Sequence, residues 1–120
     1  MTKPVPHVFK VKDVKAAARK AYKEKRLAAQ QGEPCKYFAD DKPIGSCVCA
    51  IGAAIPKRLA KKVQADGSNG YTLEDLLIAF PDNFKVASAK GRKILEQIQN
   101  AHDDWTHGHG TEKTFLATLK

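Results

Sequence analysis

The sequence predicts a mainly α-helical single domain with a small β-hairpin (α+β), packed around a central helix rich in Cys, Ala and Gly. Three observations predict this. Strong helix formers recur at helical spacing over residues 13–31 and 84–105. Two prolines and a glycine mark a turn-rich stretch at residues 33–46. Residues 47–55 form the most apolar run and are rich in small residues, as expected of a buried segment.

The composition suits one domain over residues 1–120, with residues 1–11 as a partly flexible N-terminal arm. The chain has 21 Lys and Arg against 13 Asp and Glu, a formal charge of +8. This balance favours nucleic acid, an anionic surface or an acidic protein as partner. The odd count of three cysteines and the polar start of the chain predict a cytoplasmic location. No apolar run approaches the roughly 20 residues of a membrane span, so no membrane partner is expected.

The first elements are an extended arm and a long helix. Pro4 and Pro6 keep the arm extended. Its apolar residues Val8, Phe9 and Val11 form either a short strand or an apolar latch, of which we favour the latch. The helix over residues 13–31 has small apolar residues at helical spacing and ends at Gly32.

The opposite side of this helix carries basic residues three or four positions apart, which form one positive stripe. A second basic cluster follows Pro56. A solvated face is the ordinary interpretation of such stripes, and a surface for phosphates or for an acidic partner is the functional one. The candidate binding residues are Lys12, Lys15, Arg19, Lys23, Arg26, Lys57, Arg58, Lys61 and Lys62.

The middle of the chain predicts a hairpin over residues 33–46 and then the central helix over residues 47–55, capped by Ser46. Pro56 interrupts this helix and suits the first turn of a second short one over residues 56–64. Thr72 begins a further capped helix, which Pro81 ends.

The last part of the chain predicts a long helix over residues 84–105, whose apolar stripe includes Leu95, Ile98 and His102. Thr111 then caps a final helix that packs back on the core through Phe115 and Leu119.

Four side chains carry possible chemistry: Cys35, Cys47, Cys49 and His102. If residues 47–55 are helical, Cys47 and Cys49 point about 200° apart, which disfavours a shared zinc ion. A thiol nucleophile at Cys47 with His102 as base is a second interpretation. We favour core thiols and a core or boundary histidine with a hydrogen-bond partner. We expect no metal, no cofactor and no catalytic residue.

A histidine pair, His107 and His109, follows Asp103 and Asp104 closely in the sequence. In an extended segment these histidines would project together as metal ligands. Because glycines flank them, we interpret the pair as part of a surface turn.

The pattern Cys35-x-Tyr, then Cys49-Ala-Ile-Gly-Ala-Ala-Ile, then Leu95-x-x-Ile98-Gln99-x-Ala101-His102-Asp103, resembles a loose group of small phage and prophage proteins. The resemblance covers roughly residues 12–119. It implies a mostly helical phage-type domain, located in the bacterial host cytoplasm, and it implies no activity. Cys47 and the loop around residues 66–69 depart from the pattern.

These observations predict a non-enzymatic protein that binds a host macromolecule, with inhibition of a host or defence system as its expected effect. One alternative is a basic nucleic-acid-binding protein that makes non-specific phosphate contacts. The other alternative is a thiol- or metal-dependent hydrolase. The sequence leaves the oligomeric state open.

Overall fold

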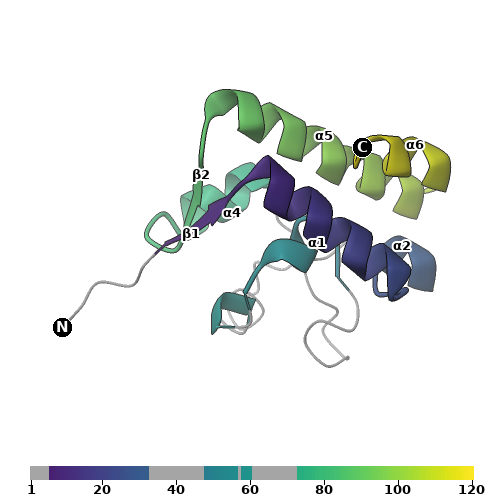
Figure 1. Cartoon of the computed structure of the whole chain (residues 1–120), viewed down its shortest axis with the longest axis horizontal. Helices are drawn as coiled ribbons and strands as arrows, with labels where there is room; N and C mark the ends of the chain where they lie inside the picture. Colours follow the sequence, from purple (N-terminus) through teal and green to yellow (C-terminus); the bar gives the residue numbers. More distant parts are fainter. Residues whose placement is uncertain (1–5, 33–47, 57, 61–72) are drawn as a thin grey trace.

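The computed structural model describes residues 6–32, 48–56, 58–60 and 73–120. In chain order, the elements are β1 (His7–Phe9), α1 (Val11–Lys23), α2 (Ala28–Gln31), the 3-10 turn η1 (Gly52–Ala54), α4 (Leu73–Ala79), β2 (Phe84–Val86), α5 (Ala89–Thr106) and α6 (Glu112–Ala117). Figure 1 shows the two strands at one end of the molecule and α2 and α6 at the other, with α1 and α5 running between them. The described residues are therefore mostly helical with a small sheet, which confirms the predicted fold class.

The described residues contain one two-stranded sheet, in which β1 and β2 pair in parallel, with His7 opposite Phe84 and Phe9 opposite Val86. The rings of Phe9 and Phe84 stack with their centroids 5.5 Å apart. Residues 7–9 thus form a strand rather than the latch that we favoured. Phe84–Val86 is also a strand, whereas the sequence predicted a helix there. Aromatic and β-branched residues suit a strand that has a partner.

The helix predicted over residues 13–31 is divided into α1 and α2. The division occurs at Lys25, which has a left-handed φ of 59°. This turn allows Leu27 to form an isolated bridge with Val48, in which the Ala28 amide donates to the Val48 carbonyl at 2.8 Å. A contact with a segment far along the chain therefore overrides the local helix propensity.

The described part of the central segment, residues 48–55, is largely buried as predicted, but it does not form the predicted α-helix. Val48 forms a β-bridge with Leu27 and is therefore not helical. Within residues 48–55, the helical part is the 3-10 turn at Gly52–Ala54. Ile55 is extended, with φ −80° and ψ 124°, because a following proline disfavours the helical conformation. Residues 58–60 are helical after Pro56, as predicted, whereas the hairpin at residues 33–46 lies outside the described residues.

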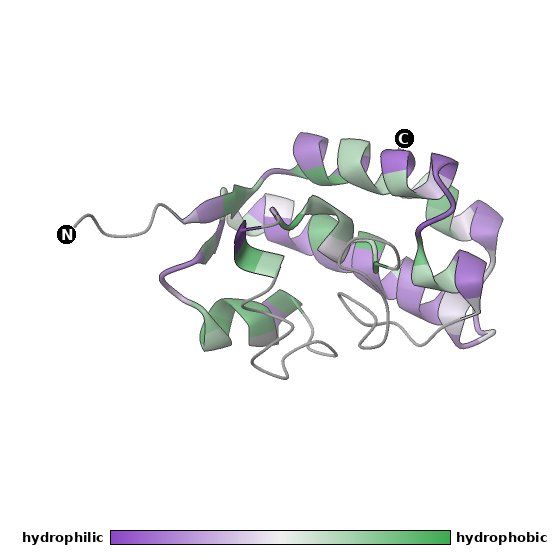
Figure 2. Cartoon of the chain, turned by 90° about the horizontal axis from the view of Figure 1, so that it is seen from below, coloured by the Kyte–Doolittle hydropathy of each residue, from purple (hydrophilic) through white to green (hydrophobic). Residues whose placement is uncertain are grey.

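The core lies where α1, η1 and α5 pack together, and α6 and α2 pack against α5. The ribbons of α1 and α5 alternate between hydrophilic and hydrophobic residues along their length, as amphipathic helices do (Figure 2). Cys49 and Ile51 have no exposed surface, so the central segment contributes core side chains without being a helix.

A hydroxyl side chain caps the N-terminus of each of the two C-terminal helices, α5 and α6. Ser88 Oγ accepts a hydrogen bond from the Gly91 amide at 3.0 Å, and Thr111 Oγ1 accepts one from the Thr114 amide at 3.1 Å. The helix predicted to begin at residue 84 therefore begins after Ser88. The final helix begins after Thr111 as predicted, and it buries Phe115 and Leu119.

Candidate anion-binding face

The candidate site is the solvent-facing side of α1. The helix buries Val14, Ala18 and Ala21, so the residues on the opposite side face water. Four basic residues are exposed there, and we call them the basic outer face: Lys12, Arg19, Lys20 and Lys23. Lys12 and Lys23 are eleven residues apart, which corresponds to roughly 16 Å along a helix. The face is therefore a row of positive charges about three turns long.

Two members of the predicted stripe are bonded to the end of α6. Lys15 Nζ donates to the main-chain oxygen of Lys120 at 2.8 Å, and Arg19 Nη2 donates to the carbonyl of Leu119. Carbonyls at the end of a helix carry partial negative charge, so cations there are favourable. The Leu119 carbonyl carries no formal charge, so it leaves the positive charge of Arg19 in place. Lys15 and Arg19 therefore stabilise the fold as well as contributing charge to the surface.

Arg26 does not continue the row. It follows the left-handed turn at Lys25 and lies beyond the end of α1. Its Nη2 lies 2.7 Å from Glu24 Oε1, and its Nε lies 2.8 Å from the same oxygen. The positive charge of Arg26 is therefore matched by a neighbouring carboxylate.

Lys20 was not among the predicted site residues, although it is exposed and lies one turn before Lys23. Helical periodicity could have identified it, because Lys20 lies on the side of the helix away from the buried Val14 and Ala18. Residues 10–26 contain eight Lys and Arg and two acidic residues. This segment therefore carries most of the excess positive charge of the chain.

The second predicted cluster is only partly described, since Lys57, Lys61 and Lys62 lie outside the described residues. Arg58 is exposed. Burial lowers the pKa of the His7 imidazole, the nearby positive charge of Arg58 lowers it further, and the negative charge of Asp13 acts in the opposite direction. Arg58 is thus within electrostatic reach of β1.

Of the four residues considered as nucleophile, base or metal ligands, the structure describes Cys49 and His102, and both lie inside the core. Cys49 is fully buried, and its Sγ accepts from the Gly52 amide at 3.1 Å. His102 is also fully buried, and its Nε2 accepts from the Ala29 amide at 3.4 Å. Burial lowers the pKa of His102 to about 4, so it is neutral near pH 7. The prediction of a core histidine with a hydrogen-bond partner is confirmed, whereas Cys35 and Cys47 lie outside the described residues.

The histidine pair after α5 lies at the surface. His107 Nδ1 is 2.8 Å from the Asp103 carbonyl and 3.4 Å from Asp103 Oδ1. His109 is exposed. Among the residues that the structure describes, no three His, Cys, Asp or Glu side chains are grouped so as to hold a metal ion.

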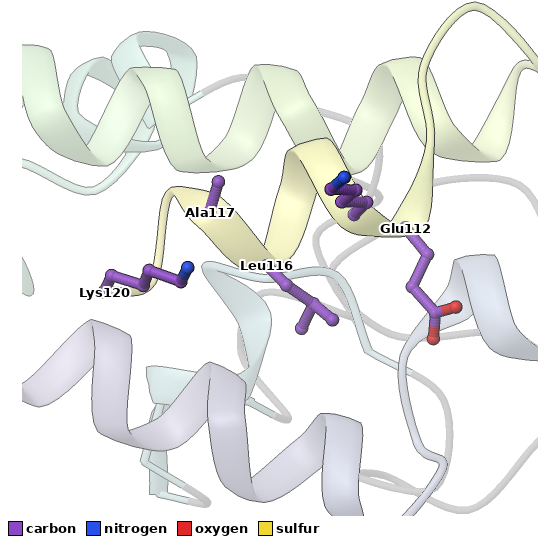
Figure 3. Close-up of a pocket in the computed structure, with 5 residues that line it drawn as sticks. Glu112, Leu116, Ala117 and Lys120 are labelled. Atoms are coloured by element: carbon purple, nitrogen blue, oxygen red, sulfur yellow. The ribbon is translucent and has the colours of Figure 1, made fainter.

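A shallow hollow of about 370 Å³ lies along α6. The described residues that line it are Glu112, Lys113, Leu116, Ala117 and Lys120. Figure 3 shows Glu112 and Leu116 extending from α6 on the side where α1 runs. Consistent with this, the Tyr22 hydroxyl on α1 donates to Glu112 Oε1 at 2.5 Å. Because one helix supplies these residues and they converge on no catalytic group, we assign the hollow no chemistry.

Comparison with protein-family models, with curated proteins and with solved structures gives no match for this chain. Within the described part of the chain, no helix combines the length and apolar character needed to cross a membrane.

Proposed function

We propose that this protein is a non-enzymatic binding protein that attaches to a host macromolecule through the basic outer face of α1. The observation that carries the proposal is the row of exposed cations on one side of a helix whose other side is buried in the core. A helix held in this way presents its charges in a fixed order, which favours binding to an anionic surface.

The resemblance of the sequence to small phage and prophage proteins supports a host macromolecule as the target. Such a protein acts as an inhibitor when it covers a surface that the host macromolecule needs for its own contacts. This mode of action requires no catalytic group.

The hydrolase alternative gains no support from the described thiol and imidazole. A nucleophile and its base must reach the substrate, whereas Cys49 and His102 are both fully buried. Burial also holds the pKa of His102 near 4, which makes it a weak base. We therefore place the function at the surface of the protein.

Affinity capture from a bacterial lysate tests the proposal. The full chain is the bait, and its control carries Lys12→Gln, Lys20→Gln and Lys23→Gln together. We expect the full chain to retain a host macromolecule that is released by moderate salt and that the triple variant does not retain. Capture that is equal with both baits would reject the basic outer face as the binding surface.

A further inference from the structure

We infer that the anionic partner of the basic outer face is a nucleic-acid duplex, contacted at its phosphates. This inference rests on the proposed function and specifies its partner. Both an acidic protein and a nucleic acid would complement the charge of α1, so other properties of the face must distinguish them.

The residue types on the face favour nucleic acid. Three of its four members are lysines, and Ala16 is the small exposed residue between them. The centres of protein–protein interfaces are depleted in lysine and depend on aromatic or large apolar anchors. Among the described residues the exposed large hydrophobic side chain is Ile78, which lies on α4 rather than on α1. The basic outer face therefore lacks the anchor that a protein partner requires, whereas phosphate binding requires only the cations.

The dimensions of the face also suit a duplex. The row from Lys12 to Lys23 is roughly 16 Å long. The major groove of B-DNA is about 12 Å wide, so a row of this length, extended by flexible lysine side chains, spans from the phosphates on one side of the groove to those on the other.

The packing of α1 against the rest of the protein determines which parts of a duplex it can contact. Its flank is bonded to the end of α6 through Lys15 and Arg19, and its inner side packs on η1 and α5. A helix flanked in this way does not enter a groove deeply enough to reach the base edges. We therefore expect α1 to contact phosphates without sequence preference. The hydrogen bond to Leu119 holds Arg19 in place, and the three flexible lysine side chains adjust to the phosphates around it.

The test is fluorescence anisotropy with a labelled 20-base-pair DNA duplex of mixed sequence, measured over a series of KCl concentrations. Four phosphate contacts predict a slope of log K against log salt of roughly −3.6, so affinity falls about a hundredfold between 50 and 200 mM salt. Combining Lys12→Gln, Lys20→Gln and Lys23→Gln should reduce the magnitude of this slope by about 3. The matched control combines Lys85→Gln, Lys90→Gln and Lys93→Gln, which are exposed on β2 and α5 and remove the same charge.

A loss of affinity confined to the α1 variant supports the inference, and an equal loss in both variants overturns it because net charge alone would then explain binding. Labelled polyglutamate, measured at the same salt concentrations, separates the two classes of partner. If polyglutamate binds through the same three lysines and the duplex does not bind, the nucleic-acid inference fails while the proposed function stands. If neither polyanion binds, both fail. Circular dichroism of both triple variants confirms that they are folded.

Discussion

The guanidinium group of Arg19 on α1 donates a hydrogen bond to the main-chain carbonyl of Leu119, just beyond the end of α6. Lys15, one turn earlier, does the same for Lys120. A helix stripe that looks uniform in the sequence therefore has two kinds of members. Substituting Lys15 or Arg19 changes the packing of α6 as well as the surface charge, so binding is better tested through Lys12, Lys20 and Lys23.

The first prediction separates these two kinds of members. Arg19→Gln should lower the free energy of unfolding by about 1 kcal/mol, because α6 loses a charged hydrogen-bond donor at its C-terminal end. Lys23→Gln, on the same helix, should change it by less than about 0.5 kcal/mol. Urea denaturation of both variants at one pH and one salt concentration provides the comparison. Equal values for the two variants would contradict the structural role of Arg19.

Features that depend on neighbouring residues could be predicted from the sequence. The Thr111 cap requires only a hydroxyl three residues before an amide, and the burial of His102 follows from its position one turn after Ile98 on an apolar stripe. The start of α4 at Leu73 also agrees with the helix that the sequence predicted after Thr72. In each case, the prediction uses only the pattern of residues along one helix.

Features that depend on distant pairing could not be predicted. The register of His7 with Phe84 and the bridge of Leu27 with Val48 join segments that carry no mutual signal in a single sequence. These contacts convert expected helical residues into strands or turns. The sequence also could not show which cations of α1 lie beside α6, because that depends on where α6 packs. Arg19 is therefore easy to recognise as a surface cation and impossible to recognise as a partner of Leu119.

The second prediction concerns acid stability. Burial lowers the pKa of His102 to about 4, against a usual value of 6.5, so the folded protein binds fewer protons than the unfolded chain between these values. Above about pH 6.5, His102 is neutral in both states and does not reduce the free energy of unfolding. As the pH falls from 6.5 toward 4, the free energy of unfolding decreases by up to about 1.4 kcal/mol per pH unit. We expect a loss of about 2 kcal/mol between pH 7 and pH 5, measured by urea denaturation.

The variant His102→Gln tests the origin of this loss, because a side chain that does not titrate should flatten the dependence on pH whatever its effect on stability at pH 7. His109→Gln, at an exposed position, should leave the dependence unchanged. A smaller residual slope is expected from His7, whose pKa is also lowered, mainly by burial. A slope that persists undiminished in His102→Gln would exclude His102 as its main cause.

The third prediction tests the observed start of α5. Ser88 accepts a hydrogen bond from the Gly91 amide, so Ser88→Ala should lower the free energy of unfolding by about 1 kcal/mol. Ser88→Asp retains an acceptor and adds a negative charge at a helix N-terminus, so it should be at least as stable as the parent chain. Thermal melts of both variants, converted to free energies, provide the measurement. If alanine and aspartate gave the same stability, Ser88 would not be the cap and the helix would begin elsewhere.

The fourth prediction tests whether the central segment is core although it is not an α-helix. Ile51 has no exposed surface, and its amide donates a hydrogen bond to Gln99 Oε1 at 3.2 Å. Truncating a buried isoleucine leaves a cavity, so Ile51→Ala should cost about 3 kcal/mol of unfolding free energy. Ile78 is 70% exposed, and the same truncation there should cost less than about 0.5 kcal/mol. Denaturant titrations of the two variants compare identical chemical changes at two degrees of burial. Similar costs at both positions would mean that residues 48–56 do not pack as the structure describes, and the support that this segment gives to α1 would then need another explanation.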